Sequence, residues 1–359
     1  MLEKNMIPKS TFKKSFWDFL RYDLDLKNEN TSSHEVPSHY INDYFKHGLL
    51  IDNNSSPKID NLICQICKKF SIPRSSLTLF VFASSEIQAT CLNISQQECI
   101  IQISSGLVNL LNENELSFVI GHELGHFIFD HGINIKNDRS LEHFQKLRSQ
   151  EISVDRIGLI SCGKLDYAMS AILKSISGLD ENFLDFNIGH FINQIHKAKP
   201  NEKDNNFLDS HPSFIVRSRA LLLFASSGIL QENFKDIQQI ELKKINESIK
   251  KEFDKFVDLP LNNKINEILN ECAIWESAKI ILSDEKFDKI EQEKFKNHFN
   301  QDILKKLKNF INSFSKNDVM NQIEKKIDEN KNNLKSLIPT QFEMKHNEMT
   351  KMIINLFKN

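Results

Sequence analysis

The run from His122 to His126, which reads HELGH, constrains this chain more than any other feature of its sequence. An α-helix has 3.6 residues per turn, so two histidines four residues apart lie on one face, one turn from each other. Both imidazoles can then reach the same metal ion. Glu123 would flank that ion, where a carboxylate is able to take a proton from a metal-bound water and later return it to a leaving group. The run therefore predicts half of a zinc site on a helix, with a general base beside it.

The residues before this run predict where its helix begins. Asn112 is followed three residues later by Glu115, which is the pattern of a capping box, and an apolar stripe starts at Leu116. Apolar residues continue at helical spacing as far as Ile128. The sequence thus predicts a helix that is buried on one side and carries both histidines.

A catalytic zinc ion usually has three protein ligands and one open position, so a third ligand should follow on another element. Residues 141–162 have the pattern of a second helix, on which Glu151 and Asp155 lie one turn apart. We predict that Glu151 completes the zinc site and that Asp155 accepts the second ring N–H of a ligating histidine, which fixes its tautomer. Gly158, on nearly the same face, would let the two helices approach closely. A solvent-exposed acidic face is the alternative for any such pair of carboxylates.

Four motifs together resemble the zinc metallopeptidase family that includes HtpX and the CAAX prenyl proteases, peptidase family M48 of the gluzincin type. The resemblance covers the chain from about residue 57 to residue 227. The motifs follow the family's order and approximate spacing: SSGLVNLL at 104–111, HELGH at 122–126 with His131 five residues on, EISVD at 151–155, and His211-Pro212 followed by Arg217.

The resemblance implies one zinc ion per chain, held by His122, His126 and Glu151. It implies that Glu123 is the general base and that Asp155 orients a ligand. A protein or peptide would be the substrate, and a zinc-activated water would hydrolyse its peptide bonds.

The last motif leaves two roles open. Arg217 would help to order the cleft. His211 would be a catalytic residue that hydrogen-bonds to the developing oxyanion, where the loss of one donor costs about 3 kcal/mol in other hydrolases, or it would bind zinc as a fourth ligand in a latent form. Its structural alternative is a histidine at a helix start, which Pro212 suits. We interpret His131 as a residue that packs beside the site or supports a ligand, and not as a ligand itself.

Two short β-rich runs lie upstream of the motif, at residues 77–82 and 99–103, with residues 87–92 as a candidate third strand. Zinc proteases commonly bind substrate as an extended strand at a sheet edge beside the metal, and we expect one of these strands to supply that edge. The expected fold class is therefore α+β: a zincin-like metallopeptidase domain, mostly helical with a small β-sheet, followed by an all-α C-terminal domain.

We divide the chain into an N-terminal arm or cover, a zinc metallopeptidase domain and a helical C-terminal domain: residues 1–56, 57–228 and 229–359. After residue 228 there is no glycine and there are only two prolines, Pro260 and Pro339, while apolar residues recur at helical spacing. We expect breaks near both prolines and near residues 283–284.

Part of the C-terminal range, residues 273–299, resembles the helical TerB-like domains that are attached to some bacterial proteins. The alternative is an unrelated helical bundle. In either case these helices would bind a partner protein or self-associate, since an amphipathic helix often docks in a groove of its partner.

Composition fits a soluble enzyme and argues against other classes. Charged residues make up 26% of the chain but the net charge is only −2, so the sequence carries no general footprint of a nucleic-acid-binding protein. No stretch approaches the roughly 20 apolar residues that span a bilayer, and the N-terminus lacks the pattern of a signal peptide. The six cysteines do not suggest a disulfide framework in a chain of 359 residues. We expect a cytoplasmic protein without a transmembrane segment.

These observations predict a zinc-dependent metalloendopeptidase. The alternative is a latent or inactive zinc-binding scaffold, or a chaperone-like module, whose C-terminal helices bind partners. An intact Glu123 argues against a purely structural zinc site, because such a site has no use for a general base.

Overall fold

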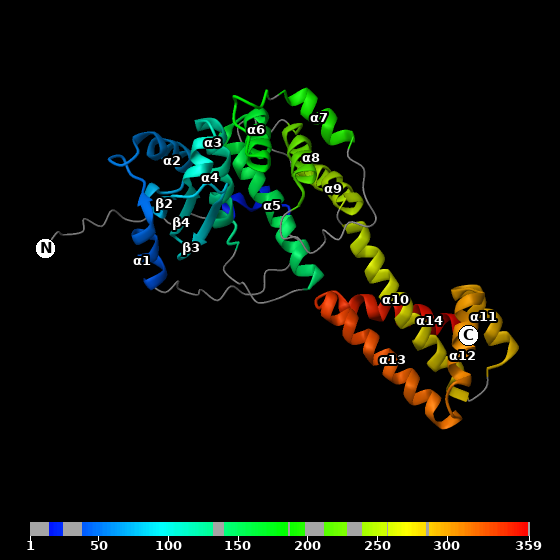
Figure 1. Ribbon diagram of the computed structural model, residues 1–359. Helices are drawn as coiled ribbons and strands as arrows, with labels where there is room; N and C mark the ends of the chain where they lie inside the picture. Colours follow the sequence, from blue (N-terminus) through cyan, green and yellow to red (C-terminus); the bar gives the residue numbers. More distant parts are fainter. Residues whose placement is uncertain are drawn as a thin grey trace. The chain divides into compact units, whose positions relative to one another are not determined.

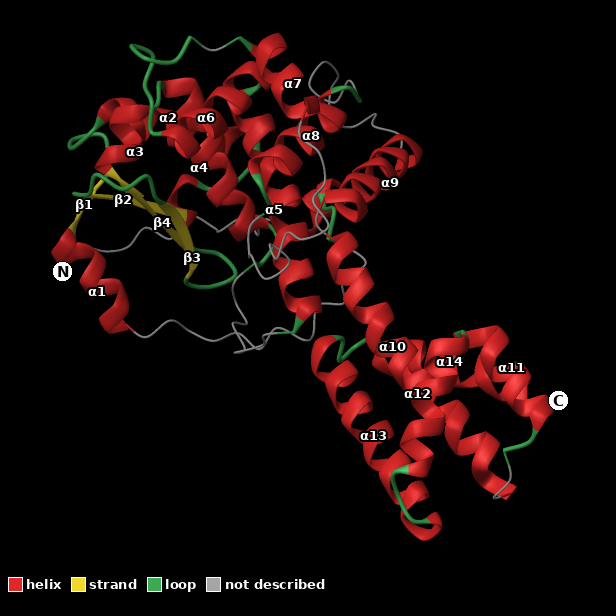
Figure 2. Cartoon of the chain, turned by 45° about the vertical axis from the view of Figure 1, so that its right-hand side comes forward, coloured by secondary structure: helices red, strands yellow, loops and turns green. Residues whose placement is uncertain are grey.

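The computed structural model describes residues 14–23, 38–131, 140–185, 187–197, 212–227, 239–256, 258–284 and 287–357. Within these residues the chain is mostly helical and forms one small sheet (Figure 1; Figure 2). The chain divides into two compact units. Unit 1 is the described part of residues 1–137, 146–201 and 209–256, and unit 2 is the described part of residues 138–145, 202–208 and 257–359.

Unit 1 contains the sheet and the helices that surround it. Its elements are η1 (Lys14–Leu20), α1 (Ser38–His47), β1 (Gly48–Leu50), α2 (Pro57–Lys69), η2 (Arg74–Ser76), β2 (Leu77–Phe82), β3 (Ala89–Asn93), β4 (Cys99–Ser104), α3 (Ser105–Leu110), α4 (Glu113–Ile128), α5 (Leu141–Cys162), α6 (Leu165–Ser177), α7 (Ile188–Lys197), α8 (Phe214–Ala225) and α9 (Gln239–Phe256). The first residues of α5, up to residue 145, belong to unit 2.

The sheet has the strand order β1-β2-β4-β3. The inner strands β2 and β4 are parallel, with Leu79 opposite Ile101, and β1 and β3 pair with them in antiparallel fashion. The predicted strands at 77–82 and 99–103 are confirmed, while the third lies at Ala89–Asn93 instead of 87–92. Strand β1 was not predicted, because its three residues are too few to show the alternation of apolar and polar side chains that marks a strand. Strand β3 is an edge of this sheet and packs against α4.

Helix α4 begins with the capping box that the sequence predicted. The Asn112 side chain accepts hydrogen bonds from the backbone N–H groups of Asn114 and Glu115 at 3.0 and 3.1 Å, and Glu115 accepts one from the Asn112 backbone at 2.9 Å. These bonds satisfy N–H groups that the first turn of a helix leaves without partners. The other carboxylate interactions of Glu115 are with Ser170 and Lys174 of α6, so the cap also ties α4 to a neighbouring helix.

Glycines allow α4 and α5 to cross at close range. A Cβ atom on Gly125 would lie 2.9 Å from the Cβ of Val154, and one on Gly158 would lie 2.8 Å from the carbonyl oxygen of Phe118. Real Cβ atoms do not come so near, so both positions require glycine for this packing. The close approach predicted for Gly158 is thus confirmed, and Gly125 within the HELGH run serves the same purpose. The crossing brings the histidines of α4 within reach of the carboxylates of α5.

The N-terminal segment from residue 14 to residue 23 is built into the core of unit 1. Trp17 and Leu20 are buried with residues of α2 and α4 in one apolar cluster. The Lys14 ammonium pairs with Asp130 at 2.6 Å, and Arg156 of α5 donates a hydrogen bond to the Leu20 carbonyl at 2.8 Å. This part of the predicted range 1–56 therefore helps to form the unit, and a role of that range as a cover stays a prediction.

The elements of unit 2 after residue 257 are helical wherever the structure describes them. They are α10 (Asp258–Ile281), η5 (Leu282–Asp284), α11 (Lys289–Phe299), α12 (Gln301–Asn312), α13 (Lys316–Leu337) and α14 (Phe342–Phe357). Helix α10 packs against α13 and α14, and α11 packs against α12 and α14. Breaks follow Ile281 and Leu337 as expected. The expected break near Pro260 is also present, since α9 ends at Phe256 and α10 begins at Asp258, with Pro260 in the first turn of α10, where a proline is tolerated. Helix α9 belongs to unit 1, and an independent all-α domain at 229–359 stays a prediction.

Among the described residues, no helix combines the length and the apolar character that crossing a membrane requires.

Candidate metal centre

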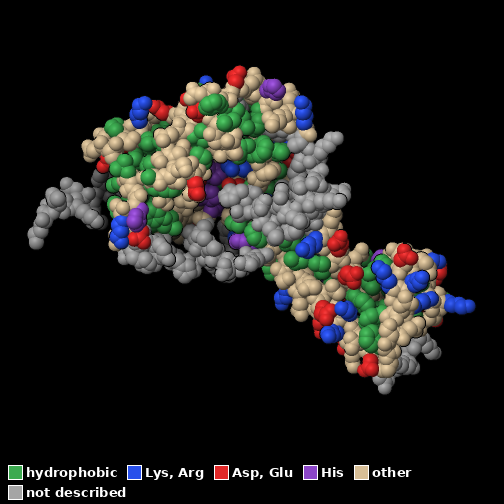
Figure 3. Space-filling model, viewed as in Figure 1, with side chains coloured by type: hydrophobic (Ala, Val, Ile, Leu, Met, Phe, Trp, Pro, Cys, Tyr) green, Lys and Arg blue, Asp and Glu red, His purple; other side chains and the backbone are tan. Residues whose placement is uncertain are grey.

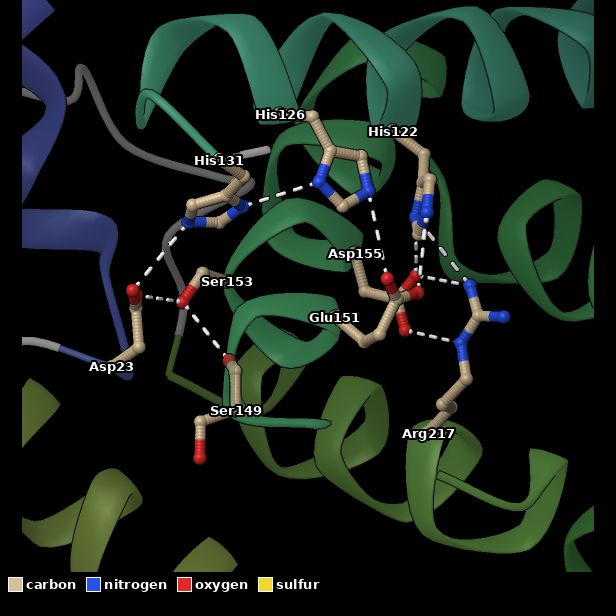
Figure 4. Close-up of polar contacts among 9 residues, drawn as sticks. All are labelled: Asp23, His122, His126, His131, Ser149, Glu151, Ser153, Asp155 and Arg217. Carbon is tan, nitrogen blue, oxygen red and sulfur yellow. Dashed lines mark hydrogen bonds and ion pairs between the residues drawn. The ribbon is translucent and has the colours of Figure 1, made fainter. Parts of the chain in front are cut away.

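Helices α4 and α5 bring the three predicted ligands together. His122 and His126 project from adjacent turns of α4 toward Glu151 on α5, as Figure 4 shows. One donor atom from each residue lies within 4.8 Å of the other two. No other group of three or more histidine, cysteine or acidic residues within the described ranges meets this criterion. The predicted set His122, His126 and Glu151 is therefore assembled in one place.

The spacing of the donor atoms suits a zinc ion. His122 Nε2 lies 3.4 Å from one oxygen of Glu151, and His126 Nε2 lies 3.5 Å from the other. Ligands about 2.1 Å from a tetrahedral zinc ion are about 3.4 Å apart, so small adjustments would place these atoms around one ion. Two imidazoles and one carboxylate are also the ligand types of known catalytic zinc sites. The residues present therefore fit zinc.

Asp155 fixes the orientation of His122. Its Oδ1 lies 2.9 Å from His122 Nδ1, and the carboxylate is almost completely buried. A carboxylate can only accept here, so the proton of the neutral ring sits on Nδ1 and the lone pair of Nε2 faces Glu151. This is the arrangement that a zinc-ligating histidine needs. The contact agrees with the role that the sequence predicted for Asp155.

Arg217 of α8 holds Asp155 in turn. Its Nε donates to Asp155 Oδ2 at 2.8 Å and its terminal nitrogen donates to Oδ1 at 2.6 Å, which is a bidentate pair. Burial opposes ionisation of Asp155, but Arg217 and His122 outweigh it, and the pKa of Asp155 is lowered. A chain of contacts thus runs from α8 through Asp155 to His122. The ordering role predicted for Arg217 is consistent with this geometry.

The electrostatics of the site favour a cation between its carboxylates. Burial disfavours a charge on His122, but hydrogen bonds to Asp155 and Glu151 outweigh burial and raise its pKa to about 10. For Glu151, burial also favours the neutral form, yet the interactions with His122 and His126 hold its pKa well below the usual range. Two buried carboxylates therefore stabilise a positive charge at the histidines, whether a proton or a metal ion supplies it.

Glu123 follows His122 on α4 and is buried. Burial raises the pKa of Glu123 to about 7, with His122 lowering and Glu151 raising that value. A carboxylate with a pKa near neutrality is able to accept and release a proton under physiological conditions.

The surface of unit 1 is open at the histidines. The side chain of His126 is 21% exposed to solvent, whereas that of Glu151 is 6% exposed. Figure 3 shows histidine atoms in a hollow of this surface. Of the three candidate ligands, His126 is therefore the one with the most exposed side chain.

Two further predicted residues have different outcomes. His131, which the sequence places beside the site, lies next to His126, with their Nδ1 atoms 3.2 Å apart (Figure 4). His211 lies outside the described residues. The structure also brings in Asp23, whose Oδ2 is 3.4 Å from His131 Nε2. No motif or periodicity around Asp23 indicated this position, because a single aspartate about 100 residues before the HELGH run carries no local signal.

Comparisons with known proteins relate this chain to a peptidase family. Residues 53–144 match Peptidase family M48, a range that includes both histidines and Glu123 and ends before Glu151. The chain is 26% identical over 166 residues to the plastoglobule-localized metallopeptidase 48, chloroplastic, of Arabidopsis thaliana. This similarity covers 41% of the chain and 48% of that protein, so the chain spans about half of the relative's length. No solved structure matches the chain.

Proposed function

Because this chain belongs to peptidase family M48, we propose that it is a zinc-dependent metalloendopeptidase that hydrolyses peptide bonds in proteins or peptides. The observation that carries the proposal is the convergence of His122, His126 and Glu151, with a buried Glu123 next to the first of them. We assign one zinc ion per chain to these three ligands.

When bound, zinc would polarise the scissile carbonyl and make an attacking water more acidic. Glu123 accepts the proton that this water loses and passes it to the nitrogen of the leaving amine. Burial raises the pKa of Glu123 above its usual range, which makes it a stronger base than an exposed glutamate. Asp155 and Arg217 keep the His122 ring in the tautomer and orientation that a ligand requires.

Strand β3 is the sheet edge that we propose for substrate binding. It borders the described sheet on the side opposite β1 and packs against α4. The Asn93 side chain, at the end of β3, donates a hydrogen bond to the His131 carbonyl at 3.0 Å, which ties the strand to the end of the HELGH helix. A peptide added to this edge would extend the sheet by backbone hydrogen bonds.

The roles of the remaining predicted features are proposals as well. His211 would stabilise the oxyanion or cap the metal in a latent form. The helices of unit 2 would bind a partner protein or self-associate, and the enzyme would act in the cytoplasm. A zinc scaffold without peptidase activity is not favoured, since a buried carboxylate beside the ligands costs stability and has no use in a structural site.

The test compares wild type with Glu123→Gln. Zinc content is measured by elemental analysis and cleavage of casein is followed with the same preparations. We expect one zinc per chain in both proteins and cleavage only by wild type, because the amide cannot accept a proton. Full activity of Glu123→Gln would remove Glu123 from the role of base. One zinc in both proteins without cleavage in either would favour the latent form, and an absence of zinc from both would refute the site.

A further inference from the structure

His131 pairs with the proposed zinc ligand His126, and the proposed reaction gives His131 itself no role. His131 follows the end of α4, and its backbone N–H donates to the His126 carbonyl at 2.9 Å. The His131 carbonyl accepts a hydrogen bond from the Asn93 side chain, so hydrogen bonds hold the His131 backbone on both sides. The side chain of His131 is only 3% exposed. The ring therefore has a defined place, with its Nδ1 3.2 Å from His126 Nδ1.

The protonation of this pair follows from the proposed zinc site. Two nitrogen atoms at hydrogen-bond distance share one proton, because a lone pair must face an N–H. A histidine that binds zinc through Nε2 carries its proton on Nδ1. His126 is then the donor and His131 Nδ1 the acceptor, which leaves the proton of a neutral His131 on Nε2.

The Nε2 atom of His131 faces Asp23, whose Oδ2 is 3.4 Å away and whose side chain is 1% exposed. Arg21 donates to the two oxygens of this carboxylate at 2.8 and 3.3 Å. Ser153 lies on α5 between Glu151 and Asp155. Its hydroxyl donates a hydrogen bond to Asp23 Oδ1 at 2.6 Å and accepts one from the backbone N–H of Tyr22. Asp23 is thus held beside His131, with its carboxylate at ion-pair distance from the ring Nε2 (Figure 4).

We propose that Asp23 is a positioning residue for the metal ligand His126 and that it acts through His131. The carboxylate favours the His131 tautomer with its proton on Nε2, His131 Nδ1 then accepts from His126 Nδ1, and the lone pair of His126 Nε2 is directed at the metal. The inference rests on the proposed zinc site. The Nδ1 atom of His122 contacts a carboxylate, Asp155, directly, whereas the Nδ1 atom of His126 is linked to the Asp23 carboxylate through the imidazole of His131.

The test measures the zinc dissociation constant of the full chain by competition with a chromophoric chelator. It is accompanied by the melting temperature of the zinc-free protein. Supporting partners of zinc-ligating histidines typically contribute about 10- to 100-fold to metal affinity. We expect His131→Phe to weaken zinc binding by about 10- to 100-fold and Asp23→Asn by about 10-fold. His131→Asn, whose amide oxygen is able to accept from His126, should restore most of the affinity.

Two controls separate positioning from simple anchoring of the N-terminal segment. Lys14→Met removes the ion pair with Asp130 that holds the same segment but leaves Asp23 and His131 untouched. It should lower the melting temperature without changing the zinc dissociation constant. Adding Asp23→Asn to His131→Phe should cause no further loss of affinity, because residues that act in series are not additive.

Wild-type zinc affinity in folded His131→Phe or Asp23→Asn would overturn the inference while leaving the zinc site intact. Equal losses of affinity in Lys14→Met and Asp23→Asn would also overturn it. If His131→Phe does not fold, His131→Asn and Asp23→Asn decide the matter, because the inference requires near-wild-type affinity in the first and weakened affinity in the second. A wild-type protein without zinc affinity would refute the proposed function itself, and the inference with it.

Discussion

Unit 1 and unit 2 differ in where they keep their charged side chains. Among the described residues, every buried charged or histidine side chain belongs to unit 1, and the buried polar residues of unit 2 are Ser140 and Ser277. Unit 2 packs an apolar core around residues such as Phe295 and Ile323, and pairs its charges at the surface, as in Lys279 and Glu324.

Burying a charge costs several kcal/mol unless other groups compensate it. Unit 1 meets this cost with networks such as Arg217 with Asp155 and Lys174 with Glu115. The network around Asp155 supports the candidate metal centre directly. Unit 1 therefore buries charged groups that support a candidate metal centre, whereas the described helices of unit 2 bury mainly apolar side chains and keep their charges at the surface.

The sharpest challenge to this contrast is the removal of a ligand. Glu151→Ala should weaken zinc binding by more than about 100-fold, the upper range for loss of a supporting residue, and abolish peptidase activity. Zinc per chain and casein cleavage are the measurements. Glu324→Ala, which removes a surface carboxylate of unit 2, is the matched control and should change neither. Full metal retention by Glu151→Ala would show that another group completes the site.

A second prediction concerns the cost of breaking a buried pair. Lys174→Met leaves the carboxylate of Glu115 buried without its cation, since both side chains are only 4% exposed. We expect a loss of about 3–5 kcal/mol in the free energy of unfolding, measured by chemical denaturation.

Lys279→Met in unit 2 breaks a pair whose side chains are about half exposed. Its effect on the free energy of unfolding should be small, because solvent already screens that pair. Equal losses in the two variants would erase the distinction between the units.

The smallest expected effect is that of pH on activity. Glu123 must be ionised to act as a base, and its raised pKa means that it takes up a proton as the pH falls through about 7. The value of kcat/KM should therefore decline below that pH by up to tenfold per unit. A bound cation stabilises the carboxylate and shifts this limb to lower pH. Zinc content at each pH is the control, and a value of kcat/KM that rises as the pH falls, with zinc retained, would contradict the assignment.

The sequence predicted most of the candidate site because the relevant signals are local. The one-turn spacing of His122 and His126, and that of Glu151 and Asp155, places each pair on one face of a helix. The capping box at Asn112 set the start of α4, and the predicted helix 141–162 has the observed bounds. The sheet was less predictable: strand β1 and the order β1-β2-β4-β3 depend on pairing between distant segments.

By itself, the sequence determined which residues share a helix face, since backbone periodicity fixes that without knowledge of any other element. Only the tertiary structure decided what those faces meet. The crossing at Gly125 and Gly158 brings the carboxylates of α5 to the histidines of α4. Burial of Trp17 and Leu20 in the core holds the N-terminal segment in place, and Asp23 of that segment lies beside His131. Such contacts join residues up to about 130 positions apart, as between Asp23 and Ser153. They arise from burial and close packing of the whole unit, which no local pattern encodes.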